Sequence, residues 1–80
     1  MRRLIIDVKR TPSGAGWTAE WRGLGRHTDY DTKARALAQA QLEAQTHELR
    51  GGLAQIVVHK RDGRIQYEAT FGADPRRSVG

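Results

Sequence analysis

The segment Asp31–Arg50, DTKARALAQAQLEAQTHELR, is the one stretch of the chain with the pattern of a long helix. From Thr32 to Leu49 it contains neither Gly nor Pro, and good helix formers such as Ala, Leu, Gln and Arg dominate. A side-chain oxygen of Asp31 or Thr32 can cap the first free backbone N–H groups. Gly51-Gly52 offers the left-handed conformation that ends helices. The pattern predicts a helix from about Thr32 to Leu49.

Helical spacing also predicts which side of this segment packs against the rest of the chain. One side gathers small and apolar residues with two glutamines among them: Ala34, Leu37, Ala38, Gln41, Leu42, Gln45 and Leu49. The other side carries Arg35, Gln39, Glu43 and His47. Because the first set is made mostly of small residues, we expect it to lie close to a flat partner such as a sheet.

Two strand-like runs precede the helix. Arg3–Arg10 and Trp17–Arg22 both alternate apolar and polar residues, as half-buried strands do, and the turn-rich loop Thr11–Gly16 joins them into a hairpin. Residues Gly23–His27 then either end the second strand in a bend or begin a short third strand. The sequence leaves both possibilities open.

Two further strand-like runs, Leu53–Lys60 and Arg64–Phe71, follow the helix, and Asp62-Gly63 between them predicts a tight type I′ hairpin. The predicted fold is therefore α+β: two β-hairpins flanking one helix (ββαββ), a four-stranded antiparallel sheet with the helix on one face. Residues 1–73 form this single domain, and residues 74–80 are expected to be a flexible basic tail.

Size and composition limit the function. Eighty residues allow one small core, and without Cys there is neither a disulfide framework nor a thiolate metal site, which fits a cytoplasmic location. No run approaches the roughly 18 apolar residues of a membrane span, and Asp7 interrupts the apolar start, so we expect no membrane segment and no signal peptide. The formal net charge of +5 favours nucleic acid or an acidic protein surface as partner.

Cations that flank the turns are the best functional candidates, because a projecting hairpin tip can contact phosphates or enter a DNA groove. The predicted contacts to DNA or RNA are Lys9, Arg10, Arg22, Arg26, Lys60, Arg61 and Arg64. The alternative is that such cations only keep an exposed hairpin soluble and prevent edge-to-edge pairing.

A second hypothesis concerns the sheet face that the helix leaves open. Apolar residues on that face predict a protein interface, either with another protein or with a second copy in a homodimer. The candidates are Ile5, Thr18, Leu53 and Val57. A monomer and a homodimer both fit the sequence.

No group of residues predicts catalysis, a cofactor or a metal site. The residues that could suggest a metal are His27, Asp29, Asp31, His47 and His59, but no pair has the spacing of a zinc enzyme on a helix. His59 could be a general base or a contact to a partner, but it lacks a nearby nucleophile. We therefore expect a structural role, as a cross-strand partner or a satisfied hydrogen-bond donor beside Tyr67. Trp17 and Trp21 could stack bases, but we expect them to fill the core against the small helix residues.

Parts of the chain resemble the domain of unknown function 2188, a family of small bacterial and phage proteins. The resemblance rests on Trp17, on Asp31-Thr32-Lys33 with Ala36 and Ala40, and on Val57-Val58-His59 followed by Asp62-Gly63-Arg64-Ile65-Gln66. It covers roughly Gly16–Gly72. It implies a compact domain of strands and one helix in a prokaryotic or phage setting, and it implies no activity.

Overall fold

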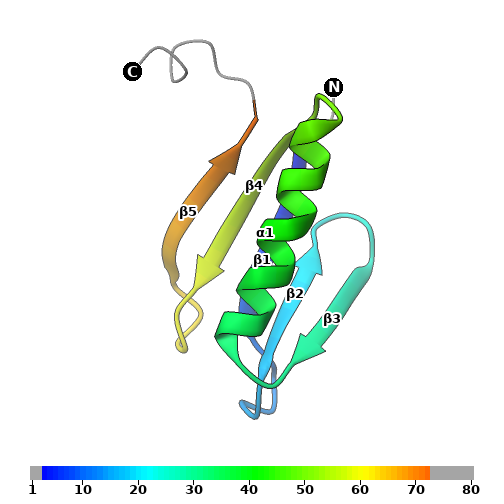
Figure 1. Cartoon of the computed structure of the whole chain (residues 1–80). Helices are drawn as coiled ribbons and strands as arrows, with labels where there is room; N and C mark the ends of the chain where they lie inside the picture. The colour runs from blue at the N-terminus through cyan, green and yellow to red at the C-terminus, as the bar shows by residue number, and fades with distance from the viewer. Residues whose placement is uncertain (1–2, 73–80) are drawn as a thin grey trace.

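The computed structural model describes residues 3–72, which form five strands and one helix. The elements are β1 (Arg3–Arg10), β2 (Trp17–Trp21), β3 (Arg26–Tyr30), α1 (Lys33–Leu49), β4 (Leu53–His59) and β5 (Ile65–Phe71). The strands form one sheet in the order β3-β2-β1-β4-β5, and α1 packs on one face of it (Figure 1). The α+β class is confirmed. The predicted tail at 74–80 lies outside the described residues.

The prediction of four antiparallel strands is wrong, because the chain forms a third strand before the helix and pairs β1 with β4 in parallel. Of the two possibilities for Gly23–His27, the third strand is the right one. The backbone N–H of Leu24 bonds the carbonyl of Trp21 at 3.1 Å, and Gly23 and Gly25 both have positive φ. This tight turn reverses the chain, and β3 pairs antiparallel with β2.

The parallel pairing follows from the number of strands before the helix. Three antiparallel strands leave the chain running in the direction of β1, and the helix then runs back. With 17 residues, α1 is about 25 Å long, which matches a strand of seven or eight residues. The chain therefore returns to the end of the sheet where β1 begins, and β4 runs parallel to β1. Two strands before the helix would have made this pair antiparallel.

The helix packs through a different face from the predicted one, and of the predicted side only Leu37 packs against the core. Its buried residues are Ala36, Ala40 and Ala44, whereas Leu42 is 57% exposed and Leu49 is 87% exposed. The three alanines lie four residues apart and form a flat stripe, so the helix approaches the sheet closely. The sheet supplies the bulky side chains of this core, and the helix supplies almost none.

The bulky part of the core comes from the three central strands. Its largest fully buried side chains are Trp21, Ile6, Ile56, Val8 and Val58. Trp17 is half-buried and packs against the same cluster. Both tryptophans therefore contribute to the core, as predicted.

Both ends of the helix have the expected signals. Thr32 is the N-cap, since its hydroxyl accepts from the backbone N–H of Arg35 at 3.1 Å. At the other end, the N–H groups of Gly51 and Gly52 bond the carbonyls of Glu48 and His47, which is a Schellman motif. In residues 3–72, no helix is both long enough and apolar enough to cross a membrane.

The packing face of α1 can be tested by enlarging one alanine on each side. Ala40→Leu adds volume to a fully buried position and is expected to destabilise the fold by about 1–3 kcal/mol. Ala38→Leu adds the same volume to an exposed position and is expected to change stability by less than about 0.5 kcal/mol. Urea unfolding followed by circular dichroism measures both. The reverse order would support the face predicted from the sequence.

Candidate nucleic-acid interface

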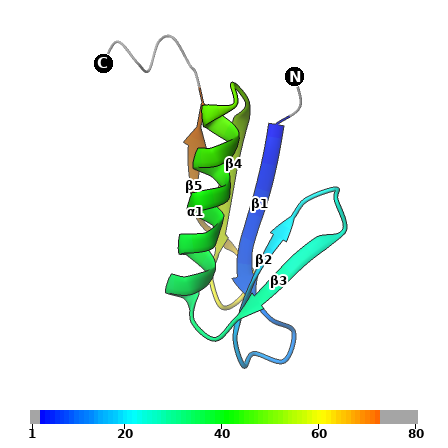
Figure 2. The same cartoon turned by 45° about the vertical axis from the view of Figure 1, so that its right-hand side comes forward.

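The parallel pairing of β1 and β4 places two hairpin connections at the same end of the molecule. The loop 11–16 follows β1, and the turn 60–64 follows β4. Figures 1 and 2 show both connections at the lower end of the sheet, and we call this the tip end. The ladder between β1 and β4 runs to Val8 opposite Val58. Two residues farther along each strand direction, Arg10 ends β1 and Lys60 begins the turn after β4.

The first connection is held by its own hydrogen bonds. The backbone N–H of Thr11 bonds the carbonyl of Gly16 at 3.0 Å, and that of Gly14 bonds the carbonyl of Thr11 at 2.9 Å. The Arg10 guanidinium donates to the carbonyl of Gly14 and lies over the ring of Trp17, 5.6 Å from its centroid. The loop is thus preformed, with Arg10 at its base.

The second connection differs from the predicted type I′ turn. Gly63 has a φ of 92°, but no residue other than glycine has positive φ in the described chain, so Asp62 is not left-handed. The N–H of Gly63 bonds the carbonyl of Lys60 at 3.0 Å. The Asp62 carboxylate accepts from the N–H of Arg64, also at 3.0 Å. The result is a tight turn that presents Lys60, Arg61 and Arg64.

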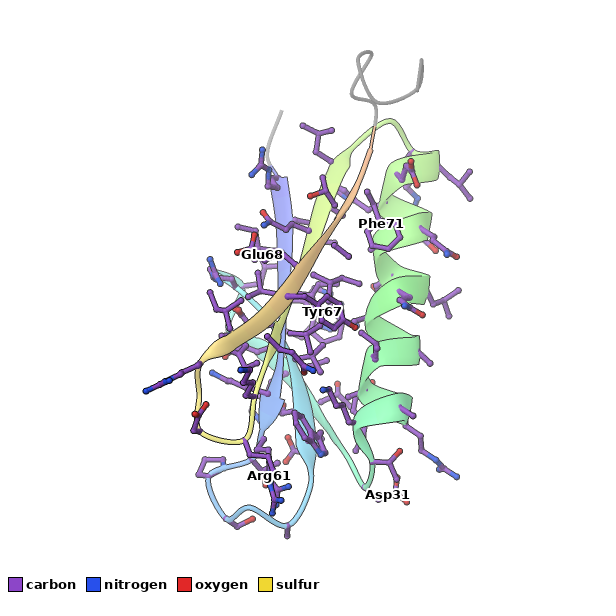
Figure 3. The ribbon with its side chains drawn as sticks, turned by 90° about the vertical axis from the view of Figure 1, so that its left-hand side faces the viewer. Asp31, Arg61, Tyr67, Glu68 and Phe71 are labelled. Atoms are coloured by element: carbon purple, nitrogen blue, oxygen red, sulfur yellow. The ribbon has the colours of Figure 1, made fainter. Side chains whose placement is uncertain are left out.

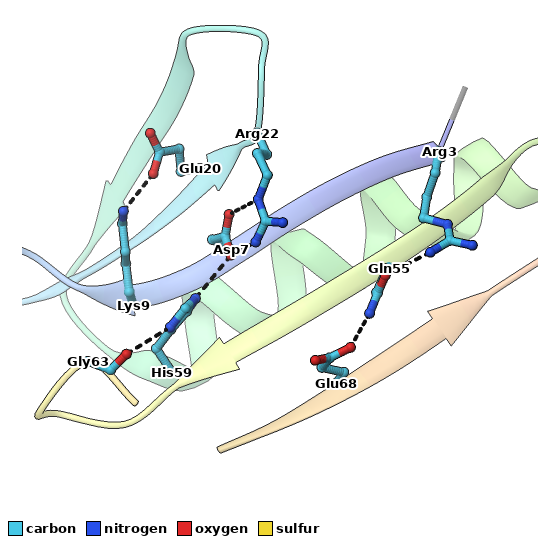
Figure 4. A network of polar contacts seen from close by, with 9 residues as sticks. All are labelled: Arg3, Asp7, Lys9, Glu20, Arg22, Gln55, His59, Gly63 and Glu68. Atoms are coloured by element: carbon cyan, nitrogen blue, oxygen red, sulfur yellow. Dashed lines mark hydrogen bonds and ion pairs between the residues drawn. The ribbon is translucent and has the colours of Figure 1, made fainter. Parts of the chain in front are cut away.

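His59 fixes this turn to the centre of the sheet. Its Nε2 lies 3.0 Å from Oδ1 of Asp7, and its Nδ1 lies 3.2 Å from the carbonyl oxygen of Gly63 (Figure 4). A shift in register after Val58 places His59 opposite Ile65, so Tyr67 is not its cross-strand partner. The expected structural role of His59 is thus a brace between β1 and the β4–β5 turn.

Asp7 is the centre of the polar network on the sheet face opposite the helix. Its oxygens accept from Nε of Arg22 at 3.0 Å and from Nη2 at 2.7 Å, which is a two-pronged ion pair. Burial by itself raises the pKa of Asp7, but hydrogen bonds and charges from Arg22 and His59 outweigh burial and hold this pKa below its ordinary value. The hydrogen bond to Asp7 in turn raises the pKa of Arg22.

The structure brings together only part of the predicted basic set. Arg10, Lys60, Arg61 and Arg64 belong to the tip end, and Figure 3 shows Arg61 there, far from the middle of the sheet. Among the described residues, Lys60 and Arg61 make no ion pair. Arg64 makes one with Asp62 at 3.7 Å, but its side chain is 83% exposed, so the pair is weak.

The other three predicted cations are used within the fold. Lys9 pairs with Glu20 at 2.7 Å on the open face. Arg22 pairs with Asp7. Arg26 lies over the ring of Trp21, 4.1 Å from its centroid, at the opposite end of β2 from the tip end. Arg22 and Arg26 therefore lie away from the cluster at the tip end, whereas Lys9 is next to Arg10 but has its charge paired with Glu20.

The predicted protein-interface residues do not form an exposed apolar patch. Thr18 and Val57 are only 6% and 4% exposed, although both lie in strands whose outer face no helix covers. Ile5 and Leu53 are half-buried. Long polar side chains lie across this face, and Gln55 links Arg3 to Glu68 there (Figure 4).

Sequence reasoning missed Asp7 and Lys33. Asp7 was read as the polar side of a half-buried strand, and its partner His59 lies 52 residues away along the chain. Lys33 opens the helix, but its ammonium lies over Trp17, 5.3 Å from the ring centroid, and bonds the Gln66 side chain. The sequence signal that could have pointed to Asp7 is an acidic residue within the apolar run from Leu4 to Val8.

A pocket and a metal site are the two other kinds of site to consider. A pocket of about 370 Å³ lies between the first residues of β1, the β2–β3 turn and the end of α1, at the end opposite the tips. Within residues 3–72, no group of three or more His, Asp or Glu side chains could hold a metal ion.

A scan against family models gives one match, over residues 8–71, to a family described as an uncharacterised protein conserved in bacteria, domain of unknown function 2188. The chain belongs to this family. Comparisons with curated proteins and with solved structures gave no significant match. The family match covers every strand and the helix apart from the first five residues of β1, so it contains both hairpin tips and His59 but not Asp7.

The Asp7 network predicts a specific dependence of stability on pH. Because the folded-state pKa of Asp7 is lowered, its carboxylate stabilises the fold above the unfolded-state pKa, near 3.8, and this contribution is lost as pH falls through the lower folded-state value. Asp7→Asn is expected to cost about 1–3 kcal/mol at pH 7. It is also expected to flatten the fall in stability below about pH 4.

Urea unfolding between pH 7 and pH 2 measures both effects. The matched control is Glu20→Gln, which removes a half-exposed pair with Lys9 and is expected to cost less than about 1 kcal/mol. Equal pH profiles for Asp7→Asn and the wild type would contradict the network.

Proposed function

We propose that this DUF2188 protein is a non-enzymatic binding module that holds nucleic acid at its tip end. The observation that carries the proposal is the arrangement of Arg10, Lys60, Arg61 and Arg64 on two preformed connections at one end of the sheet. Guanidinium and ammonium groups suit phosphate oxygens. Because the turns that carry them are already ordered, binding orders the side chains but not the backbone.

The charge of the chain also supports nucleic-acid binding. The chain has a net charge of +5, which attracts a polyanion at long range. Of the acidic side chains near it, Asp62 pairs with Arg64, Asp31 with Arg35 and Glu20 with Lys9, whereas Asp29 is exposed and has no ion pair among the described residues. The four cations of the proposed site, together with Lys9 and Arg35, outnumber these four carboxylates. The proposal places the protein in the bacterial cytoplasm, where nucleic acid is abundant, and needs no cofactor.

A protein interface on the open sheet face is the alternative function. It is the weaker candidate, because polar side chains lie across that face and two of the four predicted interface residues, Thr18 and Val57, are buried. It requires a polar partner rather than the apolar one expected from the sequence. Ile5→Glu is expected to abolish such binding and leave nucleic-acid binding intact.

Fluorescence anisotropy with labelled DNA and RNA tests the proposed function. The test variant is Lys60→Glu with Arg61→Glu. The matched control is Arg3→Glu with Arg50→Glu, which makes the same charge change where β1 begins and α1 ends. Four phosphate contacts predict a slope of log affinity against log salt of about −3 to −4. The test variant is expected to lose at least tenfold in affinity and about two units of slope, and the control is expected to keep its slope.

Equal losses in the two variants would mean that the positive charge acts diffusely and that the tip end is no site. Micromolar binding at about 150 mM salt, lost only in the test variant, is the expected result.

A further inference from the structure

We infer that the tip end selects double-stranded over single-stranded nucleic acid and contacts the phosphate backbone rather than the bases. This inference rests on the proposed function and adds the class of nucleic acid to it. The shared chemistry is the paired phosphate backbone of a duplex, whether DNA or RNA. Two observations carry it: where the aromatic rings lie, and how the short polar groups of the tips are used.

Single-stranded nucleic acid is usually held by aromatic rings on which successive bases stack. The chain has five aromatic residues, and all of them lie within the described residues. Trp17 lies at the tip-end side of β2, opposite Tyr30, and both Arg10 and Lys33 lie over its ring, at 5.6 and 5.3 Å from the centroid. A base could stack on Trp17 only by displacing a cation that the proposed site uses or that α1 contributes.

The remaining rings are also poorly placed for stacking. Trp21 is buried, and Tyr30 and Phe71 pack against the core. Tyr67 is 43% exposed, but it lies near the middle of β5 on the side of the helix, away from Arg61 (Figure 3). The tip end therefore offers cations without a stacking platform, which leaves phosphates as its targets.

The short polar side chains of the tips are bound within their own turns. The Thr11 hydroxyl accepts from the N–H of Gly16 at 3.2 Å, and the Ser13 hydroxyl accepts from the N–H of Ala15 at 3.3 Å. Asp62 accepts from the N–H of Arg64. Groups used in this way are not free to read base edges. The long cations remain, and they suit phosphate oxygens of any sequence.

A duplex also presents more charge to so small a site. It carries one phosphate charge per about 1.7 Å of axis, against about 3.4 Å for one strand. Arg10 ends β1 and the other three cations belong to the turn that follows the neighbouring strand β4, about 4.8 Å away, so several of them meet one short stretch of nucleic acid at once. The denser backbone of a duplex gains more from such a compact cluster.

The test compares four labelled probes of equal length by anisotropy at about 100 mM salt: duplex DNA, a duplex of scrambled sequence, duplex RNA and single-stranded DNA. Both DNA duplexes are expected to bind within threefold of each other and at least tenfold more tightly than the single strand. The two duplex types distinguish DNA from RNA as the source of the backbone. Tryptophan emission is recorded in parallel, because a base stacked on Trp17 quenches it, and no quenching is expected.

The outcomes separate the inference from the proposed function. Single-stranded binding as tight as duplex binding, with quenching and with loss in Lys60→Glu/Arg61→Glu, would overturn the inference and keep the function. A tenfold preference for one duplex sequence would overturn backbone contact. Failure of every probe, or binding unaffected by that double variant, would overturn both.

Discussion

The parallel pairing of β1 with β4 is the constraint on which the rest of this structure depends. It places β4 in the middle of the sheet, where Ile56 and Val58 join Ile6 and Val8 under the helix. It also sends β4 toward the same end as β1. Without it, the loop after β1 and the turn after β4 would lie at opposite ends, and the tip end would not exist. The core and the candidate site thus both depend on β4 running parallel to β1.

That direction is set by β3, an edge strand with no fully buried residue. β3 has the sequence RHTDY, and four of its five residues are exposed. It adds almost nothing to the hydrophobic free energy, yet it reverses the chain once more before the helix. An edge strand exposed on both faces needs no alternation of apolar and polar residues, so period-two reasoning has nothing to detect. Two glycines with positive φ, Gly23 and Gly25, were its only local signal.

The helix shows a second limit of pattern reasoning. Its existence and both caps could be predicted, because they depend on local residues such as Thr32 and Gly51. Its packing face could not, because the buried residues are alanines and two leucines face solvent. Apolar character marks the core face of a helix only when the helix supplies the bulk. Here Trp21 and the strand residues fill the core, so closeness of approach decides which helix face is buried.

The basic residues of the candidate site could be identified from the sequence because they flank turns. That they lie at the same end of the sheet could not be predicted, because it depends on the extra reversal of the chain by β3. The same holds for His59, whose partner Asp7 is remote along the chain and adjacent in the sheet.

The structure explains why the segment from Val57 to Gln66, which resembles the family, has these residues. His59 ties the turn to β1, Gly63 supplies the positive φ, and Asp62 bonds the N–H of Arg64. Both nitrogens of His59 face acceptor oxygens, Asp7 on one side and the carbonyl of Gly63 on the other, so the ring serves as a brace in this geometry. The polar atoms of this motif hold the turn in its conformation. The cationic side chains on the turn are the groups that remain accessible to a partner.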